Sequence, residues 1–246
     1  DYSFNEGESA PEAWLDYGGL GSAHVYDTAT LDGQDLWMVG SRNYDAVVWR
    51  SLDGGTTWNQ VLTIPPINPG EFSRFYFAGV YGGKLYVQAS DSGAGSQPHS
   101  LVFDGSGWSS GPKLFTQPWG GHGHHPENFA GKLVYQTYQG GWADLIAFDG
   151  EQATIVLQPQ IRDFTVANSK VYVLTMDDRI LSSSNLTEWQ EVAAAPRESS
   201  SLEILSSDVY VGTSTAELYR YTPTSDSKPG SARKSKCRSP RCTTSP

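Results

Sequence analysis

The sequence contains little sulfur. Among its 246 residues are two methionines and two cysteines, and Cys237 and Cys242 both lie near the C-terminal end. We therefore expect no disulfide and no thiolate metal site in the folded body. No run of about 18 apolar residues occurs, which excludes a membrane-spanning helix. No basic and apolar leader precedes Asp1, so we expect that a signal peptide has been removed or was never present.

Positive charge is also scarce. The 17 Lys and Arg residues face 27 Asp and Glu residues, which gives a net charge of −10. Six of the basic residues lie beyond residue 223, so residues 1–223 carry 11 basic and 26 acidic side chains. A domain this acidic repels phosphate backbones, and we expect no binding to nucleic acid. The composition suits an extracellular or periplasmic protein, and we expect that location.

Aromatic residues and glycines are plentiful, at 12% of the sequence and 26 residues respectively, as in proteins built from many short strands and tight turns. A short strand that ends in Tyr-Val or a similar pair occurs five times, with starts 49, 48, 38 and 38 residues apart. This spacing is typical of the blades of a β-propeller. The five copies begin at Leu36, Leu85, Leu133, Val171 and Val209.

One turn in the first repeat carries a specific motif. Residues 51–58 read Ser-Leu-Asp-Gly-Gly-Thr-Thr-Trp and match every fixed position of the pattern Ser-x-Asp-x-Gly-x-Thr-Trp. This turn resembles the Asp-box, or BNR repeat, of propellers that are sialidase-like in the broad sense. Degraded copies follow at residues 104–108, 149–150 and 183–189. In those families the motif joins the two outer strands of a blade on the rim, so the resemblance implies a fold and not a ligand site.

Each repeat is predicted to form a four-stranded antiparallel blade, and the fold class is therefore all-β: a five-bladed β-propeller over residues 1–223. In the first blade we expect strands at residues 24–30, 36–41, 47–50 and 58–64. The fifth repeat contains only three strands, and residues 12–17 are expected to supply the fourth and close the ring. Residues 224–246 are expected to form a disordered basic tail, either a linker remnant or an interaction segment.

Alignment of the repeats places four basic side chains at one level of the central channel: His24, Arg74, His124 and Arg162. Glu127 and Asp163 are expected beside them. Cationic and proton-sharing groups that converge in this way suit a carbohydrate or a small anionic ligand, such as a sugar acid. We therefore predict a ligand site on the central-channel face.

The segment that enters the third repeat is rich in histidine. His122, His124 and Glu127 have the chemistry to bind a divalent metal, but no second cluster completes such a site, and we assign no metal and no cofactor. A glycine-hinged recognition loop, in which Trp119 stacks on a sugar ring, and a plain exposed loop are the other interpretations. The loops between the second and third strands add further candidates for carbohydrate contacts: Arg42, Tyr44, Asp45 and Trp142.

The function follows less directly than the fold. Asp-box sialidases carry an Arg-Ile-Pro motif in the first blade, and the nearest sequence here, at residues 161–163, lies in the fourth. The main hypothesis is a monomeric, non-catalytic extracellular propeller that binds carbohydrate, and no catalytic residue is assigned. A divergent glycoside hydrolase or polysaccharide lyase is one alternative, with a candidate set of His124, Glu127, Asp45 and Asp163. A protein-interaction scaffold is the other alternative.

Overall fold

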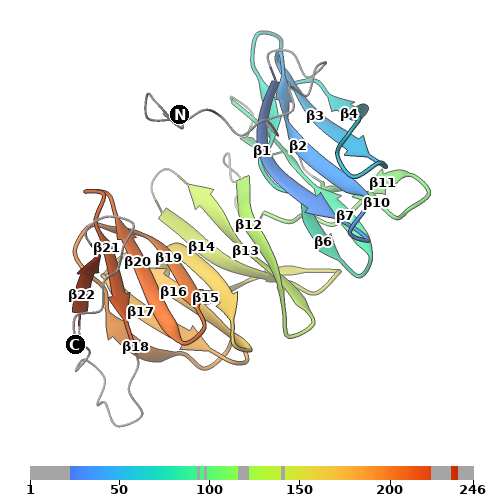
Figure 1. Ribbon diagram of the computed structural model, residues 1–246. Helices are drawn as coiled ribbons and strands as arrows, with labels where there is room; N and C mark the ends of the chain where they lie inside the picture. The colour runs from blue at the N-terminus through green and yellow to red at the C-terminus, as the bar shows by residue number, and fades with distance from the viewer. Residues whose placement is uncertain are drawn as a thin grey trace.

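The computed structural model describes residues 23–92, 95–96, 99–115, 122–139, 142–222 and 234–237. Within these ranges the regular structure consists of antiparallel β-strands, β1 to β22. The sheets follow one another in an arc, with β1–β4 and β19–β22 at its two ends (Figure 1). No helix in the described residues has the length and apolar character needed to cross a membrane.

The first sheet matches the predicted first repeat. Its four strands are hydrogen-bonded in sequence order, and each lies within a few residues of its expected position. Asn43 adopts a positive φ of 58° in the tight turn that joins the second strand to the third, a conformation that asparagine tolerates better than most residues. The strands are β1 (Ala23–Thr30), β2 (Leu36–Arg42), β3 (Asp45–Ser51) and β4 (Asn59–Ile64).

The second repeat is divided between two sheets, because its first two strands are interrupted near Ala78 and Gln88. The Ala78 N–H donates to Asp27 Oδ2 of the first sheet at 2.9 Å, and the Gln88 side chain accepts from the Leu114 N–H. Backbone and side-chain bonds are thus directed to neighbouring segments. The strands are β6 (Gly79–Tyr81), β7 (Lys84–Val87), β10 (Leu101–Phe103) and β11 (Trp108–Ser110) in one sheet, and β5 (Ser73–Phe75), β8 (Ala89–Asp91) and β9 (Gly95–Ser96) in the other.

The third and fourth repeats share one seven-stranded sheet, which corrects the prediction of separate four-stranded blades. The shared strand β15 pairs with β14 through residues 153–161 and with β16 through residues 161–167, with a bulge between Ile161 and Asp163. No glycine or asparagine stands between the two halves of β15 to form a turn. The strands are β12 (His122–Phe129), β13 (Lys132–Gln139), β14 (Trp142–Phe148), β15 (Ala153–Ala167), β16 (Lys170–Thr175), β17 (Arg179–Ser183) and β18 (Gln190–Ala194).

The last sheet corrects two further predictions. Strand β22 pairs with the outer edge of β21, the position expected for residues 12–17, which lie outside the described residues. Part of the tail predicted to be disordered therefore forms a strand. The ladder uses backbone groups, so a Lys- and Ser-rich segment can occupy an open strand edge without apolar side chains. The strands are β19 (Ser199–Leu205), β20 (Asp208–Thr213), β21 (Leu218–Tyr221) and β22 (Lys234–Cys237).

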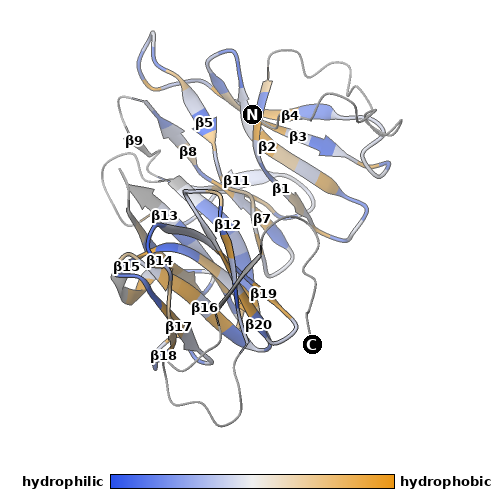
Figure 2. Ribbon diagram, turned by 60° about the vertical axis from the view of Figure 1, so that its left-hand side comes forward, coloured by the Kyte–Doolittle hydropathy of each residue, from blue (hydrophilic) through white to orange (hydrophobic). Residues whose placement is uncertain are grey.

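The core lies in layers between consecutive repeats. The inner strands are neighbours in the order β1, β6, β12, β15 and β19. Trp37 and Val48 of the first sheet pack with Phe75 and Leu85 of the second repeat, and comparable clusters follow between each later pair. Figure 2 shows the hydrophobic segments concentrated in the strands. Burial of these layers is the main source of stability for the arc.

The motif turn between β3 and β4 is held by its own side chains. Asp53 Oδ1 accepts from the Thr57 N–H at 2.8 Å and from the Ser51 hydroxyl at 2.7 Å, and the Trp58 indole donates to the Gly55 carbonyl. The Thr57 hydroxyl also donates to Asp53 Oδ2 at 2.7 Å, and this bond, followed by those from the Thr57 N–H and the Ser51 hydroxyl, lowers the pKa of Asp53 to about 2. Equivalent turns occur at the three degraded copies, where the side chains of Asp104, Asp149 and Asn185 accept backbone N–H groups.

Gly123 is buried in β12, so the segment for which a glycine-hinged loop was one interpretation is a strand from residue 122 onward. A Cβ at Gly123 would lie 2.7 Å from Phe115 Cε1 and 2.8 Å from Phe77 Cδ2. Both rings are fully buried and stack edge to face with centroids 6.1 Å apart. A glycine is therefore required here by the close approach of two aromatic rings.

Replacement of Gly123 by alanine is expected to lower the free energy of unfolding by about 1–3 kcal/mol, because the rings must move to admit the methyl group. The matched control is Gly107→Ala, since a Cβ at Gly107 meets no described heavy atom within 4 Å. The control should change stability by no more than about 0.5 kcal/mol. Urea unfolding followed by tryptophan fluorescence measures both, and equal stability of the two variants would contradict this packing.

Candidate functional site

A patch of aromatic and basic side chains lies on the inner strands of the first three repeats. It contains three of the four residues predicted to surround the channel, together with two tyrosines that the sequence analysis missed. We refer to this group as the inner patch, and its members are His24, Tyr26, Arg74, Tyr76 and His124. His24 is exposed and the other four are half-buried.

Ring contacts connect the inner patch. The centroids of Tyr26 and Tyr76 are 4.6 Å apart, and Tyr76 in turn lies 5.9 Å from His124 in an edge-on arrangement. His24 stacks on Tyr26 at 6.3 Å, with 15° between the planes. Strict strand alternation does not produce this association, because the register of β1 shifts between Val25 and Asp27 and Tyr76 follows the end of β5. Tyr26 and Tyr76 stand two positions after His24 and Arg74.

The guanidinium of Arg74 packs over the rings of its aromatic neighbours. Its guanidinium carbon lies 3.9 Å from the centroid of the Phe72 ring and 5.7 Å from that of Tyr26, and its Nη1 donates to the Tyr76 hydroxyl at 3.1 Å. Cation–π contacts of this kind fix an arginine in place while part of it stays in solvent. Arg74 thus presents an oriented cation at the centre of the inner patch.

Arg162, the fourth predicted member of the ring, makes structural bonds to its own part of the chain. Its Nη1 donates to Asp178 Oδ1 at 2.8 Å and to the Ser199 carbonyl at 2.7 Å, while Nη2 donates to the Met176 carbonyl at 3.0 Å. The ion pair is partly buried on both sides. Arg162 therefore connects the fourth repeat to the start of β19.

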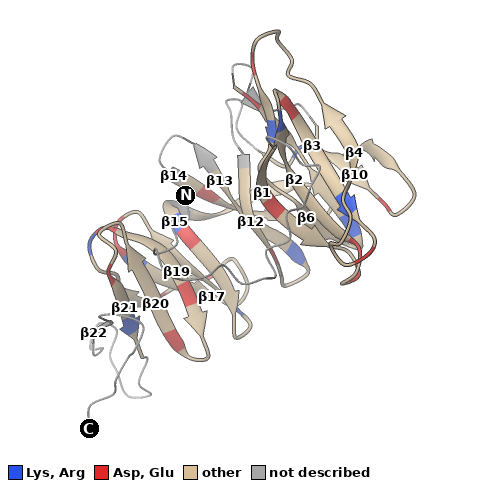
Figure 3. Ribbon diagram, turned by 45° about the horizontal axis from the view of Figure 1, so that its top comes forward, with Lys and Arg blue, Asp and Glu red and all other residues tan. Residues whose placement is uncertain are grey.

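The inner strands also carry a series of carboxylates that bond to the next repeat. Asp27 accepts from the Ala78 N–H at 2.9 Å, Glu127 from the Val166 N–H at 3.4 Å, and Asp163 from the Leu202 N–H at 2.7 Å. Figure 3 shows acidic positions on β1, β15 and β19. Burial raises the pKa of Asp27, although its backbone hydrogen bonds act in the opposite direction. These carboxylates join neighbouring repeats, and Glu127 and Asp163, proposed as site residues, are among them.

His125 connects two of these carboxylates. Its Nε2 lies 3.4 Å from Glu127 Oε1 and its Nδ1 lies 3.9 Å from Asp163 Oδ1. Asp163, and then Glu127, raise the pKa of His125 to about 10, so the imidazole is protonated at neutral pH. The backbone of His125 adopts a positive φ of 53°, at the bulge between His124 and Glu127. His122 and His124, which precede it, were considered as ligands from the sequence, whereas His125 was overlooked.

The other predicted site residues lie in several places. Arg42 and Asp45 stand opposite each other where β2 meets β3, beside Tyr44, whose side chain is 64% exposed. Trp119 lies outside the described residues. His122 and Trp142 are described only as backbone positions, in β12 and β14. In the part of the chain that the structure describes, no group of three or more His, Cys, Asp or Glu side chains is arranged to hold a metal ion.

An open cleft of about 470 Å³ lies beside the inner patch. Its walls are β1 from Asp27 to Thr30, the region of β6 around Ala78 and Val80, and β12 from His125 to Asn128. This volume is in the usual range for ligand sites, about 300–1,000 Å³. The cleft is bordered by strand edges, so it presents backbone groups as well as side chains.

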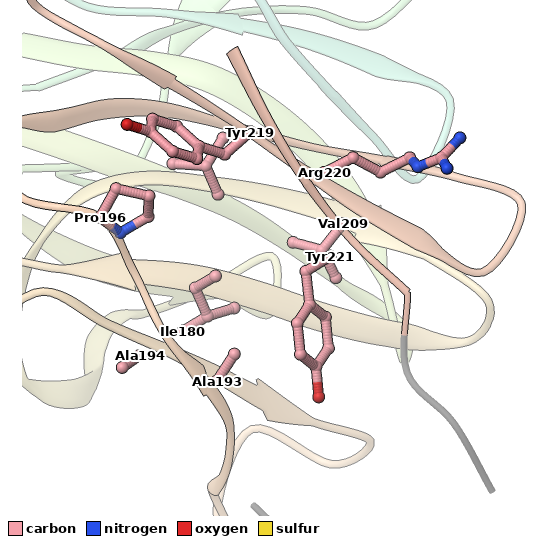
Figure 4. Close-up of a pocket in the computed structure, with 9 residues that line it drawn as sticks. Ile180, Ala193, Ala194, Pro196, Val209, Tyr219, Arg220 and Tyr221 are labelled. Atoms are coloured by element: carbon pink, nitrogen blue, oxygen red, sulfur yellow. The ribbon is translucent and has the colours of Figure 1, made fainter. Parts of the chain in front are cut away.

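A second cavity, between β17–β18 and β20–β21, is a packing gap. Figure 4 shows Ile180, Ala193, Val209 and Tyr221 around it. Its volume is about 20 Å³, close to the space of one water molecule, and its lining is almost entirely apolar. The Tyr221 hydroxyl donates to the Val192 carbonyl. Neither the size nor the lining suits a ligand.

Comparison with solved structures shows that the fold is that of a β-propeller. A structure of YCF48 bound to a D1 peptide has a TM-score of 0.56 and 15% identity, over 82% of this chain and 64% of that one. YCF48 from Cyanidioschyzon merolae has a TM-score of 0.55 and 12% identity, over 87% and 71%. The N-terminal domain of Nup159 has a TM-score of 0.51 and 16% identity, over 82% and 58%.

The chain thus spans between 58% and 71% of the length of these structures. No family model and no curated protein sequence matches it. At these identities the similarity establishes the architecture alone, because a propeller supports many functions.

The contacts of His125 with Glu127 and Asp163 predict a specific pH dependence of stability. The raised pKa means that the interaction stabilises the folded state fully below the unfolded-state value, 6.5, and is lost as the pH rises through about 10. Imidazole NMR titration of the wild type should therefore place the His125 transition near pH 10. In Asp163→Asn the transition should move toward 6.5. A wild-type transition between pH 6 and 7 would show that His125 does not form these ion pairs.

Proposed function

We propose that this chain is a protein-interaction scaffold, a five-bladed propeller whose inner face holds a segment of another protein. An extracellular or periplasmic location is part of the proposal, since the acidic composition favours it. Of the similar structures, that of YCF48 is described as bound to a peptide. From the sequence alone this function was an alternative. The scaffold function now replaces carbohydrate binding as the main hypothesis.

The observation that carries the proposal is the composition of the inner patch. Tyrosine and arginine are enriched among the residues that contribute most to protein–protein binding, because they combine a large contact area with a polar end. Here two tyrosines and an arginine are fixed against one another before any partner arrives. A preorganised surface of this kind loses little conformational entropy on binding.

Catalysis of glycoside hydrolysis has less support. That reaction requires one carboxyl group as acid and a second as nucleophile or base, both facing the substrate. Glu127 and Asp163 instead share His125 and accept backbone N–H groups from the next repeat. Of the similar structures named above, none is described as a carbohydrate complex. These two carboxylates therefore act as structural links in the proposed scaffold.

Selection from a phage-displayed library of random peptides of about 12 residues tests the proposal, with a glycan array as the parallel probe. We expect enriched peptides that bind the wild type and lose affinity by about tenfold or more with Tyr76→Ala, since the patch would lose its central ring. Asp53→Ala is the matched control: it weakens the rim turn but should leave affinity unchanged. Strong glycan binding without peptide enrichment would overturn the proposal.

A further inference from the structure

We propose that the free edge of β1 pairs with an extended, basic segment of the partner, which lies in the cleft between β1 and β12. The inference rests on the proposed function and adds the binding position, the backbone conformation and the charge of the bound segment. The partner chemistry is a strand with Lys or Arg at alternating positions.

Among the described strands, β1 has one open edge. β1 pairs with β2 on one side, and among the described strands none pairs with its other side. The Thr28 N–H donates to the carboxylate of Asp27, its neighbour in the chain, rather than to β2, so Thr28 directs its backbone outward. Because backbone direction alternates in an antiparallel ladder, Thr30 also directs its N–H and C=O outward. The Thr28 carbonyl and the N–H and C=O of Thr30 are therefore a template for an added strand.

The open edge of β1 lies along the cleft. Residues 27–30 of β1 form one wall of the 470 Å³ cleft. At about 3.4 Å per residue, this wall is about 14 Å long, enough for four residues of an added strand. Thr28 and Thr30 of this wall are both exposed.

The carboxylates that line the cleft favour a basic segment. Asp27 and Glu127 stand on opposite walls of the cleft, and His125 is the one basic side chain among the residues that line it. Asp163 does not line the cleft but lies 3.9 Å from His125 Nδ1, so its charge also acts against that of the imidazole. The carboxylates of Asp27 and Glu127 keep lone pairs that their present bonds leave open. The molecule as a whole carries a net charge of −10. An acidic cleft in an acidic protein attracts a basic segment and repels an acidic one.

The chain itself provides a precedent for this mode of pairing. Strand β22, with the sequence Lys-Ser-Lys-Cys, is added antiparallel to the edge of β21. An alternating basic segment can therefore extend one of these sheets through backbone bonds. Because this stretch of the basic tail pairs with β21, it is not the occupant that we assign to β1.

Binding of two short peptides tests the inference: an acetylated and amidated Thr-Lys repeat of about eight residues, and the matching Thr-Glu repeat. By fluorescence anisotropy at low salt, the Lys peptide should bind the wild type about tenfold or more tightly than the Glu peptide. The variant Asp27→Asn/Glu127→Gln should lower the affinity for the Lys peptide about five- to tenfold. Glu151→Gln, which removes an exposed acid in the turn between β14 and β15 that does not line the cleft, is the control and should have no effect.

A second measurement separates strand pairing from simple charge attraction. A Thr-Lys peptide N-methylated at alternate residues keeps its charge but cannot donate along one edge, and it should bind about tenfold more weakly. In NMR spectra, the unmodified peptide should protect the Thr30 amide from hydrogen exchange. Equal affinity for the methylated peptide, equal affinity for the Lys and Glu peptides, or shifts confined to β21 and β22 would overturn the inference.

These binding measurements also distinguish failure of the β1 pairing from failure of the proposed scaffold function. If library-selected peptides bind in a Tyr76-dependent way but do not respond to Asp27→Asn/Glu127→Gln, the scaffold function stands and the β1 pairing is wrong. If neither the selected peptides nor the Lys peptide binds, both fail. Self-association of the wild type, detected by light scattering and abolished by Asp27→Asn/Glu127→Gln, would assign the edge to a second copy and would also overturn the inference.

Discussion

The arrangement depends on one repeated interaction: a carboxylate on an inner strand accepts the backbone N–H of the inner strand of the next repeat. Asp27, Glu127 and Asp163 make this bond at three of the junctions between repeats. Apolar layers between the repeats supply most of the favourable free energy, but they are not directional. The carboxylate bonds supply direction, because a buried or half-buried N–H that loses its acceptor costs about 1–3 kcal/mol.

This constraint has consequences for the inner face. Carboxylates committed to backbone N–H groups and to His125 serve poorly as an acid–base pair, which is why a hydrolase receives little support from the geometry. An open cleft that Asp27 and Glu127 line lies beside the fixed tyrosines. A surface with rigid aromatic side chains, an oriented arginine and an unpaired strand edge is well suited to hold another polypeptide.

Much of the fold was accessible from the sequence. The five recurring strands and the turns at Asp53, Asp104 and Asn185 follow from residue spacing and from the local hydrogen bonding of short polar side chains. The sharing of β15 between two repeats was not accessible, since it depends on a turn that is absent rather than on a residue that is present. The pairing of β22 was equally hidden, because backbone ladders leave no side-chain signature in a Lys- and Ser-rich segment.

The candidate site was predicted in part. Alignment of the repeats brought His24, Arg74 and His124 to one region. It did not add Tyr26 and Tyr76, because Tyr26 lies at a bulge in β1 and Tyr76 follows the end of β5. It failed for Arg162 because Asp178, its partner, lies in a turn whose geometry the alignment does not contain. The role of His125 was missed for a related reason: a bulge reverses the side-chain alternation at that point, and bulges leave only a weak trace in sequence.

The most direct test of this account is hydrogen exchange at the Leu202 amide in the wild type and in Asp163→Ala. If the carboxylate joins the fourth repeat to the fifth, the amide is well protected in the wild type and exchanges at least about tenfold faster in the variant. Protection at Ala78, which depends on Asp27, should stay the same in both proteins. Equal exchange of Leu202 in the two proteins would contradict the central role of these bonds.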